Sequence, residues 1–389
     1  MIRSPRPLRI GINSLFLIPE GVGGSETYLR NVIRELPALD PSIQYTLFTN
    51  RENAGTFDLG GYDAMYDEVR CPVPAVRRPA RLAWEYSLLP LQAARAGVDV
   101  LFSPGFTAPT RPWYRSVVTI HDMQPEDLPE NFDPAYHFVL TRLMRQAART
   151  AAHILTVSEH AKRRIVAVYG VPDEKITVSP LAAESVYFQP VAATEIARVR
   201  AKYGLYAPYI LSVATLHPHK NLDALIDAYL ALRQMGGTGE TPAQLALIGL
   251  RGTATTKLEA KIREAGGEGE IILTGWVPDA DLPALYAGAT VYVSPSRYEG
   301  FGIPVLEAMA SGTPVITTTA TALPEVAGDA ALLVHPDDHA ALTVALRHVL
   351  TDAALRATLI ARGRIRARQF TWRRTAEATL AAFEAARVR

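Results

Sequence analysis

The sequence has almost no cysteine, no excess of charge and no long apolar run. Its single cysteine, Cys71, excludes an intrachain disulfide and is typical of a reducing compartment. The formal net charge of +1 excludes the strongly basic surface of a general nucleic-acid binder. No stretch offers the roughly 18 uninterrupted apolar residues of a membrane-spanning helix. The basic first residues are not followed by the apolar core of a signal peptide, so we expect a cytoplasmic protein.

Metal-binding patterns are also scarce. No cysteine and histidine cluster has the spacing of a zinc site. Asp279 and Asp281 spell an Asp-x-Asp pair, but the apolar positions of a helix follow directly, so we interpret the pair as helix capping. We therefore expect neither a metal nor a cofactor.

The 389 residues exceed the usual size of one hydrophobic core and predict two domains. Short apolar runs alternate with segments of helical periodicity, and the alternation resumes near residue 209. This order predicts an α/β protein with two Rossmann-like, doubly wound parallel sheets. Residues 180–190 lose the periodicity and are interpreted as the linker, so we expect a first domain at residues 1–185 and a second at residues 190–369.

The most informative stretch covers residues 295–318. An apolar strand is followed by the loop Glu299-Gly300-Phe301-Gly302 and by a helix that starts near Pro304. Unpaired amides and the helix dipole make such a loop an anion site. Two acids, Glu299 and Glu307, would repel phosphate there, so we expect them to accept from the hydroxyls of a vicinal diol. Together these features predict a nucleotide-sugar ligand.

The segment EGFGIPVLEAMASGTPVI closely resembles the signature of the retaining family-4 glycosyltransferases with the GT-B fold. The resemblance implies that Glu299 lies near the donor sugar and Glu307 near the ribose. Between them, Gly300, Phe301, Gly302 and Ile303 would bind the donor, largely through their amides. It also implies that the C-terminal helix, residues 370–389, crosses back onto the first domain.

In the first half, a glycine loop after the strand at residues 8–12 contains Gly23 and Gly24 and precedes a helix. Such a loop binds a ligand in some α/β domains and is merely a turn in others. The resemblance places Gly23 and Gly24 near the donor phosphates, whereas Glu26 could equally stabilise its own helix. His121 follows the strand at residues 117–120, and the resemblance implies a catalytic role beside the donor sugar. The alternative is an ordinary loop histidine.

Lys220 stands in a strand-to-helix loop of the second half. A lysine before a helix is often surface charge, but the resemblance assigns it to the donor diphosphate. Many relatives add an arginine shortly before this lysine, and this chain has none. Its place could be taken by a neutral hydrogen bond or by another cation; the candidates are Thr215, His217, His219, Arg251 and Arg297.

Three further segments carry weaker signals. Trp276 and Val277 follow a strand where relatives meet the nucleobase, although a tryptophan buried in the core is an equal alternative. The basic run at residues 162–164 is by default a solvated face, and in relatives with lipid-linked acceptors such a helix touches anionic headgroups. Arg77, Arg78 and Arg81 mark a candidate acceptor region.

The resemblance implies a hexosyltransferase. We expect a hexose to move from a nucleotide-diphospho-sugar, GDP-mannose first and UDP-glucose next, to a glycan or lipid-linked sugar. Retention by front-face attack would need neither metal nor protein nucleophile, and contact with the membrane would be peripheral. Two alternatives stay open: a nucleotide-sugar epimerase of the same fold, and an inactive nucleotide-sugar binding protein.

Overall fold

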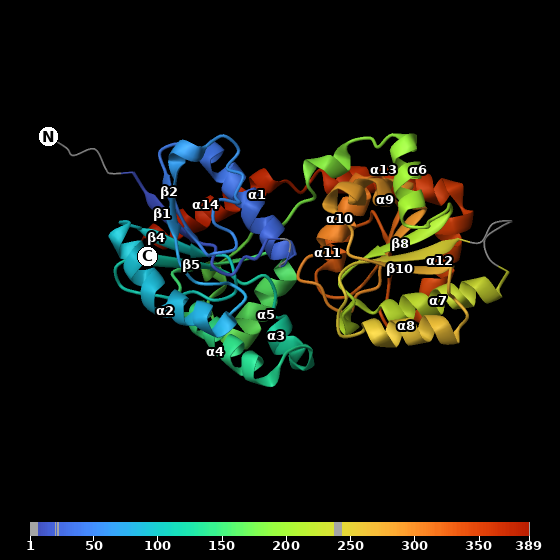
Figure 1. Ribbon diagram of the computed structural model, residues 1–389, viewed down its shortest axis with the longest axis horizontal. Helices are drawn as coiled ribbons and strands as arrows, with labels where there is room; N and C mark the ends of the chain where they lie inside the picture. The colour runs from blue at the N-terminus through green and yellow to red at the C-terminus, as the bar shows by residue number, and fades with distance from the viewer. Residues whose placement is uncertain (1–6, 20, 22, 237–242, 389) are drawn as a thin grey trace. The chain divides into compact units, whose positions relative to one another are not determined.

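The protein is described by a computed structural model that covers residues 7–19, 21, 23–236 and 243–388. It divides into two compact units, Met1–Leu181 with Thr371–Arg389 (unit 1) and Ala182–Phe370 (unit 2). Each unit contains one parallel sheet with helices on both faces (Figure 1). The predicted fold class, two Rossmann-like doubly wound sheets, is thereby confirmed.

The sheet of unit 1 has the strand order β3-β2-β1-β4-β5-β6-β7. The central strand β1 pairs in parallel with β2 on one side and β4 on the other, and Ile10 lies opposite Tyr45 and Val100. Side chains of the inner strands are buried on both faces, as expected for strands covered by helices. The strands are β1 (Arg9–Asn13), β2 (Gln44–Thr49), β3 (Tyr66–Arg70), β4 (Val100–Ser103), β5 (Arg115–Thr119), β6 (His153–Thr156) and β7 (Ile176–Val178).

The main helices of unit 1 alternate with these strands. They are α1 (Gly24–Leu39), α2 (Arg78–Arg95), the short α3 (Gln124–Asp127), α4 (Pro134–Thr150), α5 (Glu159–Tyr169) and the C-terminal α14 (Trp372–Val388). Ser158 caps α5 by accepting from the amide of Ala161 at 3.1 Å. The last helix, α14, packs against α1 and against β4 to β7, so the end of the chain belongs to unit 1.

The sheet of unit 2 has the order β10-β9-β8-β11-β12-β13. Its core gathers apolar side chains such as Leu225, Val293 and Leu346. The strands are β8 (Tyr209–Val213), β9 (Gln244–Ile248), β10 (Ile271–Gly275), β11 (Val291–Ser294), β12 (Val315–Thr318) and β13 (Leu332–Val334). The main helices are α6 (Ala193–Lys202), α7 (Leu222–Gln234), α8 (Thr255–Glu264), α9 (Leu282–Gly288), α10 (Ile303–Ala310), α11 (Leu323–Ala327), α12 (His339–Thr351) and α13 (Ala353–Ala367).

Asp281 stands at the N-cap position of α9, but its side chain makes no capping hydrogen bond, so the predicted capping contact is wrong. Asp281 is buried, and no described side chain caps α9. Its carboxylate instead accepts from Lys202 Nζ at 2.6 Å, from the Tyr203 hydroxyl at 2.7 Å and from Arg198 Nη2 at 3.2 Å. These three donors hold the pKa of Asp281 below its usual range. The residue therefore ties α6 to the start of α9.

The strand order fixes where ligands can bind. In each sheet the strand order reverses beside the first strand. The reversal lies between β1 and β4 in unit 1 and between β8 and β11 in unit 2. Ligands of doubly wound sheets bind beyond the carboxyl ends of the strands at such reversal points. In unit 2 these ends carry the loops that contain Lys220 and Glu299.

Candidate active site

Lys220 and Glu299 meet at the carboxyl edge of the unit 2 sheet. Lys220 ends the 3-10 helix η5 (Pro218–Lys220) after β8, and Glu299 lies in the loop after β11. Lys220 Nζ donates to both carboxylate oxygens of Glu299, at 2.8 and 2.9 Å. Both side chains are mostly buried, with 19% and 17% exposure. The structure thus brings together the lysine predicted to bind the donor diphosphate and the acid predicted to lie near the donor sugar.

Glu299 is held from both sides. Ser296 Oγ donates to its carboxylate at 2.7 Å, and the Thr321 hydroxyl contacts both its backbone amide and its carbonyl at 2.9 Å. Thr321 has φ +49°, a left-handed conformation that is costly for a β-branched residue. Burial would raise the pKa of Glu299, but Lys220 and Ser296 outweigh it and hold the pKa below its usual range. The carboxylate is therefore charged at neutral pH.

Asn221 fixes the loop that carries Lys220. It adopts φ +56°, which asparagine tolerates better than most residues. Its buried amide Nδ2 donates to the carbonyl oxygens of Pro295 at 3.0 Å and Pro336 at 2.8 Å. One side chain therefore joins the loops that follow β8, β11 and β13.

The two histidines before Lys220 are not a source of positive charge at neutral pH. The rings of His217 and His219 stack with centroids 5.8 Å apart. Burial and the neighbouring Lys220 lower the pKa of His219 to about 4, against the opposing influence of Glu299. Burial and Lys220 also lower the pKa of His217.

The two arginines considered in place of the missing one are paired with acids. Arg251 Nη1 lies 2.7 Å from Glu259 Oε1 on the surface of α8. Arg297 forms an ion pair with Asp337, while its backbone amide donates to the carbonyl of His219 at 2.8 Å. Arg297 therefore lies beside the Lys220 loop, whereas Arg251 is engaged elsewhere.

Thr215 lies where two loops approach closely. The Leu216 amide donates to the Leu250 carbonyl at 3.0 Å, which joins the loop after β8 to the loop after β9. Gly249 has φ +148°, and a Cβ there would lie 2.1 Å from the Ala214 carbonyl oxygen. Only glycine permits this approach. The Thr215 hydroxyl is the neutral donor that the sequence offers here.

The loop before α10 carries the predicted donor-binding glycines. Gly302 is the N-cap of α10 with φ +113°, and no described side chain caps this helix start. Phe301 is buried and packs edge-on against Phe370, with centroids 5.7 Å apart. Gly300 and Ile303 flank these residues and are partly buried. The helix start thus leaves amide N–H groups at the edge of the sheet for an anion.

Glu307 lies one turn into α10 and faces tyrosines. The Tyr286 hydroxyl donates to Glu307 Oε2 at 2.8 Å, and the Tyr187 ring packs edge-on against Tyr286. Burial raises the pKa of Glu307 to about 7; hydrogen bonds from the tyrosines oppose the shift, and the charges of Glu184 and Asp279 add to it. Glu307 therefore exchanges a proton near neutrality.

Trp276 is 49% exposed, so the alternative that it fills the core is wrong. It follows Gly275, which has φ +72° and ends β10, while the neighbouring Val277 is buried. The indole is thus displayed at the carboxyl end of a strand, in unit 2.

His121 follows β5 in unit 1 and is buried between two rings. Tyr28 and Phe106 lie edge-on to it, with centroids 5.2 and 5.3 Å away. His121 Nε2 lies 2.8 Å from the Pro104 carbonyl, which requires a proton on Nε2. Burial lowers the pKa of His121 to about 4, so the ring is neutral and its Nδ1 is an acceptor. Asp122 accepts from the Gln124 amide at 2.9 Å and so helps to fix this loop.

The predicted glycine turn of unit 1 precedes α1. Gly23 is the N-cap with φ +62°, and Gly24 is the first helical residue. Glu26 forms an ion pair with Arg30 at 2.8 Å one helical turn later. This contact favours the interpretation that Glu26 stabilises its own helix.

The basic segments of unit 1 have local partners. In the run at residues 162–164, Lys162 pairs with Asp173 and Arg164 with Asp127. Arg78 lies over the Tyr136 ring at 4.8 Å, and Arg81 pairs with the buried Glu85 at 3.5 Å. The pairing of Lys162 and Arg164 favours a solvated structural face for that run.

Two absences hold for the described residues. No group of three or more His, Cys, Asp or Glu side chains is placed to hold a metal ion. No helix among them combines the length and the apolar character needed to cross a membrane.

Sequence reasoning did not assign the residues that hold the site. The signal that could have identified Asn221 is its place in a turn directly before a helix, because asparagine tolerates a left-handed backbone. Ser296, which donates to Glu299 from three residues before it, was not assigned either. Thr321 and Tyr286 lie more than twenty residues from their partners, Glu299 and Glu307, and local patterns cannot find such contacts.

Comparison with known proteins agrees with the fold. Two family models match adjoining parts of the chain: "Glycosyltransferase Family 4" over residues 22–183 and "Glycosyl transferases group 1" over residues 196–366. These models and the two doubly wound sheets define the GT-B class of glycosyltransferases. The chain belongs to the family-4 glycosyltransferases and is a hexosyltransferase.

One relative is the O-antigen chain mannosyltransferase B of Escherichia coli, 35% identical over 310 residues, or 79% of this chain and 77% of the relative. Among solved structures, the sucrose-phosphate synthase of Thermosynechococcus elongatus is similar with a TM-score of 0.77 at 20% identity, covering 97% of this chain and 98% of that one. Anabaena Alr3699/HepE in complex with UDP-glucose has a TM-score of 0.72 at 19% identity, covering 96% and 99%. Both structures share the fold.

Proposed function

We propose that the enzyme transfers mannose from GDP-mannose to a glycan or lipid-linked sugar with retention of anomeric configuration. Support comes from the similarity to a mannosyltransferase, at 35% identity, and from the Thr-Leu-x-Pro-x-Lys-Asn turn at residues 215–221. UDP-glucose is the second donor to test.

The observation that carries the proposal is the Lys220–Glu299 pair at the strand reversal of unit 2. Because Lys220 donates to both carboxylate oxygens of Glu299, its ammonium group is held in place before the ligand binds. The donor's diphosphate would take over the ammonium group, and Glu299 would turn its freed oxygens to sugar hydroxyls. The amides before α10 would add donors to the same diphosphate.

In the proposed reaction the bond from the anomeric carbon to the phosphate oxygen breaks, and that oxygen keeps the electron pair. The acceptor hydroxyl oxygen bonds to the anomeric carbon from the same face, and its proton passes to the departing phosphate. No protein nucleophile takes part. Each preorganised donor on such a leaving group is worth about 2.7–4 kcal/mol.

The scheme needs neither the arginine that many relatives carry before this lysine nor a charged histidine in its place. His219, with a pKa of about 4, is neutral at pH 7, so Lys220 would carry the charge and Thr215 would add a neutral hydrogen bond. Because Lys220 and amides would stabilise the leaving group, we propose that no metal is needed; EDTA should then leave the rate unchanged. His121, with a neutral ring and an accepting Nδ1, stays a predicted contact of the donor sugar.

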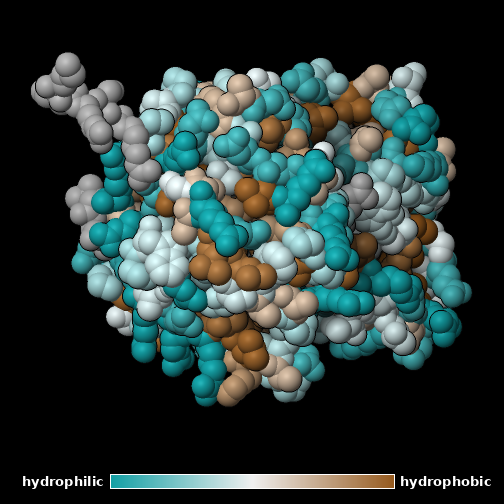
Figure 2. All heavy atoms as spheres, turned by 60° about the vertical axis from the view of Figure 1, so that its left-hand side comes forward, coloured by the Kyte–Doolittle hydropathy of each residue, from teal (hydrophilic) through white to brown (hydrophobic). Residues whose placement is uncertain are grey.

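For the acceptor we propose a peripheral approach to lipid-linked glycans through α2 and α4. Both helices expose apolar side chains beside arginines: Leu88 and Leu91 on α2, and Phe138 and Val139 on α4. Figure 2 shows one face of the molecule, on which hydrophobic (brown) and hydrophilic (teal) side chains lie side by side.

The test is a transfer assay with purified enzyme, a panel of GDP-, UDP-, ADP- and dTDP-sugars, and mannosylated acceptors. We expect transfer from GDP-mannose and an α-linked product by NMR, since the donor is α-linked. A β-linked product would overturn retention. Turnover with another donor alone would overturn the assignment of GDP-mannose, and release of free nucleotide without a glycosylated product would favour the epimerase alternative.

A further inference from the structure

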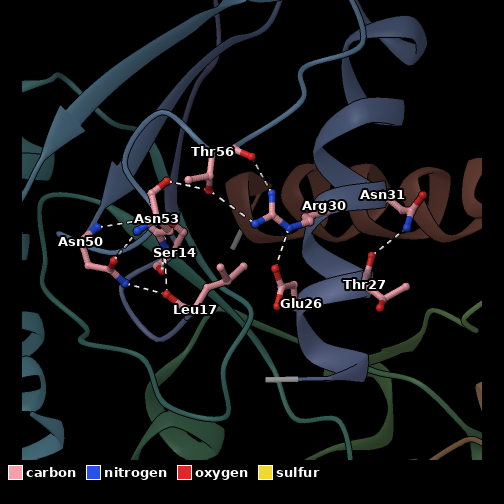
Figure 3. Close-up of polar contacts among 9 residues, drawn as sticks. All are labelled: Ser14, Leu17, Glu26, Thr27, Arg30, Asn31, Asn50, Asn53 and Thr56. Carbon is pink, nitrogen blue, oxygen red and sulfur yellow. Dashed lines mark hydrogen bonds and ion pairs between the residues drawn. The ribbon is translucent and has the colours of Figure 1, made fainter. Parts of the chain in front are cut away.

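Two buried asparagines after β2 hold the loop that follows β1 (Figure 3). Asn50 is 1% exposed and Asn53 is 0% exposed. Asn50 Nδ2 donates to the carbonyl oxygens of Leu15 at 3.0 Å and Leu17 at 2.8 Å. Asn53 Nδ2 donates to those of Ser14 at 2.7 Å and Leu17 at 3.2 Å. Both hydrogens of each amide therefore serve the carbonyls of one four-residue loop.

The amide oxygens lock the two asparagines to each other. Asn50 Oδ1 accepts from the backbone amides of Glu52 and Asn53, both at 2.8 Å, and Asn53 Oδ1 accepts from the backbone amide of Asn50 at 2.9 Å. Donors and acceptors are thus satisfied on both side chains, and a buried network of this kind specifies one geometry.

The same segment also anchors helix α1 (Figure 3). Thr56 Oγ1 donates to the Asn53 carbonyl at 2.9 Å, and Arg30 Nη1 of α1 donates to the Thr56 carbonyl at 2.8 Å. Arg30 Nε in turn holds Glu26 in the first turn of α1. Residues 50–56 therefore form hydrogen bonds on both sides of the turn that contains Gly23 and Gly24. They bind residues 14–17 before the turn and Arg30 after it.

We propose that Asn50 and Asn53 are positioning residues for sugar transfer, because they fix the geometry in which the Gly23–Gly24 turn and the start of α1 meet the substrate. The inference rests on the proposed function, and it takes from the family resemblance that this turn lies near the donor phosphates. Both side chains are buried beneath the loop and act through its backbone. The contacts are neutral and directional, so the alignment depends on amide N–H groups rather than on charge.

The decisive variants are Asn50→Asp and Asn53→Asp. Each keeps the size of the side chain but replaces the NH₂ donor with an oxygen that repels the loop carbonyls. We expect kcat/KM for transfer to fall about a hundredfold, since a small misplacement far from the chemistry costs that much. The affinity for the nucleoside diphosphate should fall much less than kcat/KM, because we assign the diphosphate chiefly to Lys220 of unit 2.

The matched control is Asn31→Asp. Asn31 is also a buried asparagine of unit 1, but its Nδ2 donates to the Thr27 carbonyl within α1 at 2.9 Å. We expect this variant to transfer within about twofold of wild type at a temperature where it is folded, because a few tenths of a kcal/mol change a rate that little. A second readout is pH. In Asn53→Asp the new carboxyl group regains one O–H donor when it is protonated, so the deficit of this variant should shrink as the pH falls.

If Asn53→Asp does not fold, Arg30→Met tests the same anchor from the partly exposed side of α1 and should lower kcat/KM about tenfold, or roughly 1.4 kcal/mol in the barrier. The inference is overturned if the folded variants transfer like wild type, or if Asn31→Asp loses as much. All variants are compared on the nucleotide-sugar that the wild type uses. If the assignment of GDP-mannose is wrong, the wild type shows this by using another donor, and the comparison between wild type and variants still holds.

Discussion

Both units hold loops at their carboxyl edges with buried asparagine amides, but the side chains predicted to meet the ligand differ in charge. In unit 1, Asn50 and Asn53 bind the loop after β1, and His121 after β5 is neutral because burial lowers its pKa to about 4. In unit 2, Asn221 binds the loops around Lys220 and Glu299, which form a buried ion pair. The predicted catalytic side chain of unit 1 is thus neutral, whereas Lys220 and Glu299 of unit 2 are charged.

The largest expected effect is that of Lys220→Ala. Removing the ammonium should lower kcat by a factor of about 100 to 1,000, as for other lost donors to a developing anion. Steady-state transfer kinetics measure it. Lys257→Ala is the matched control, because Lys257 of the same unit is 73% exposed and pairs with Asp223 on the surface. A loss under about fivefold in Lys220→Ala would contradict the charge assigned to unit 2.

The scaffold of unit 2 is tested by Asn221→Gly. Glycine accepts the left-handed backbone at φ +56°, so the change removes only the amide and leaves the Pro295 and Pro336 carbonyls without that donor. We expect a loss of about 2 kcal/mol in the free energy of unfolding. Urea denaturation measures it.

The paired variant Asn221→Ala should lose a further 1–2 kcal/mol or so, because an L-residue is strained in this conformation. Equal stability of the two variants would show that the backbone at residue 221 relaxes.

A pH-dependent effect should follow from Glu307 of unit 2. Its pKa of about 7 lies above the ordinary 4.5, so the folded state prefers the protonated form. Its contribution to stability is therefore full below pH 4.5 and is lost as the pH rises through 7. We expect Glu307→Gln to raise the melting temperature by a few degrees at pH 8 and to leave it unchanged at pH 4.5.

Some pH dependence should remain in Glu307→Gln, since burial also raises the pKa of Glu85 in unit 1 to about 7. Differential scanning calorimetry from pH 4.5 to 8 compares the two proteins. A parallel shift at every pH would mean that Glu307 does not titrate in this range.

The smallest effect is expected for Arg251→Ala. Arg251 is 68% exposed and pairs with Glu259, so we expect the KM for the donor to stay within about twofold of wild type. Arg297→Ala should have the larger effect of the two, because the lost side chain belongs to a residue beside the Lys220 loop. If Arg251→Ala raised the donor KM tenfold, Arg251 rather than Thr215 would replace the missing arginine.

The sequence predicts the fold well because alternating apolar runs and helical periodicity are local signals. Helix α5, for example, begins directly after Ser158, a typical N-cap residue, whose side chain does cap it. The edge strand β3 was not predicted, since its sequence Tyr-Asp-Glu-Val-Arg is largely polar and exposed. Helix α8 was also missed: its apolar face is short, with Leu258 and Ile262 among charged residues.

The site was predictable where a motif is contiguous and not where contacts span the sheet. Glu299, Gly302 and Glu307 come from one stretch, and Lys220 from one turn. The partners of these residues come from other parts of the chain: Thr321 from another loop for Glu299, and Tyr286 from helix α9 for Glu307. Asn50 and Asn53, which bind the loop after β1, likewise come from the segment after β2. Likewise, Asp281 was misassigned because its partners lie on α6, some eighty residues away.

The central claim is that Lys220 binds the diphosphate of the donor. Calorimetry with GDP and GMP, and with UDP and UMP, measures what the second phosphate adds to binding in the wild type and in Lys220→Ala. We predict that the diphosphate of the preferred base binds at least about tenfold more tightly than its monophosphate in the wild type, and that this ratio approaches one in the variant. A variant that retained the wild-type ratio would contradict the claim.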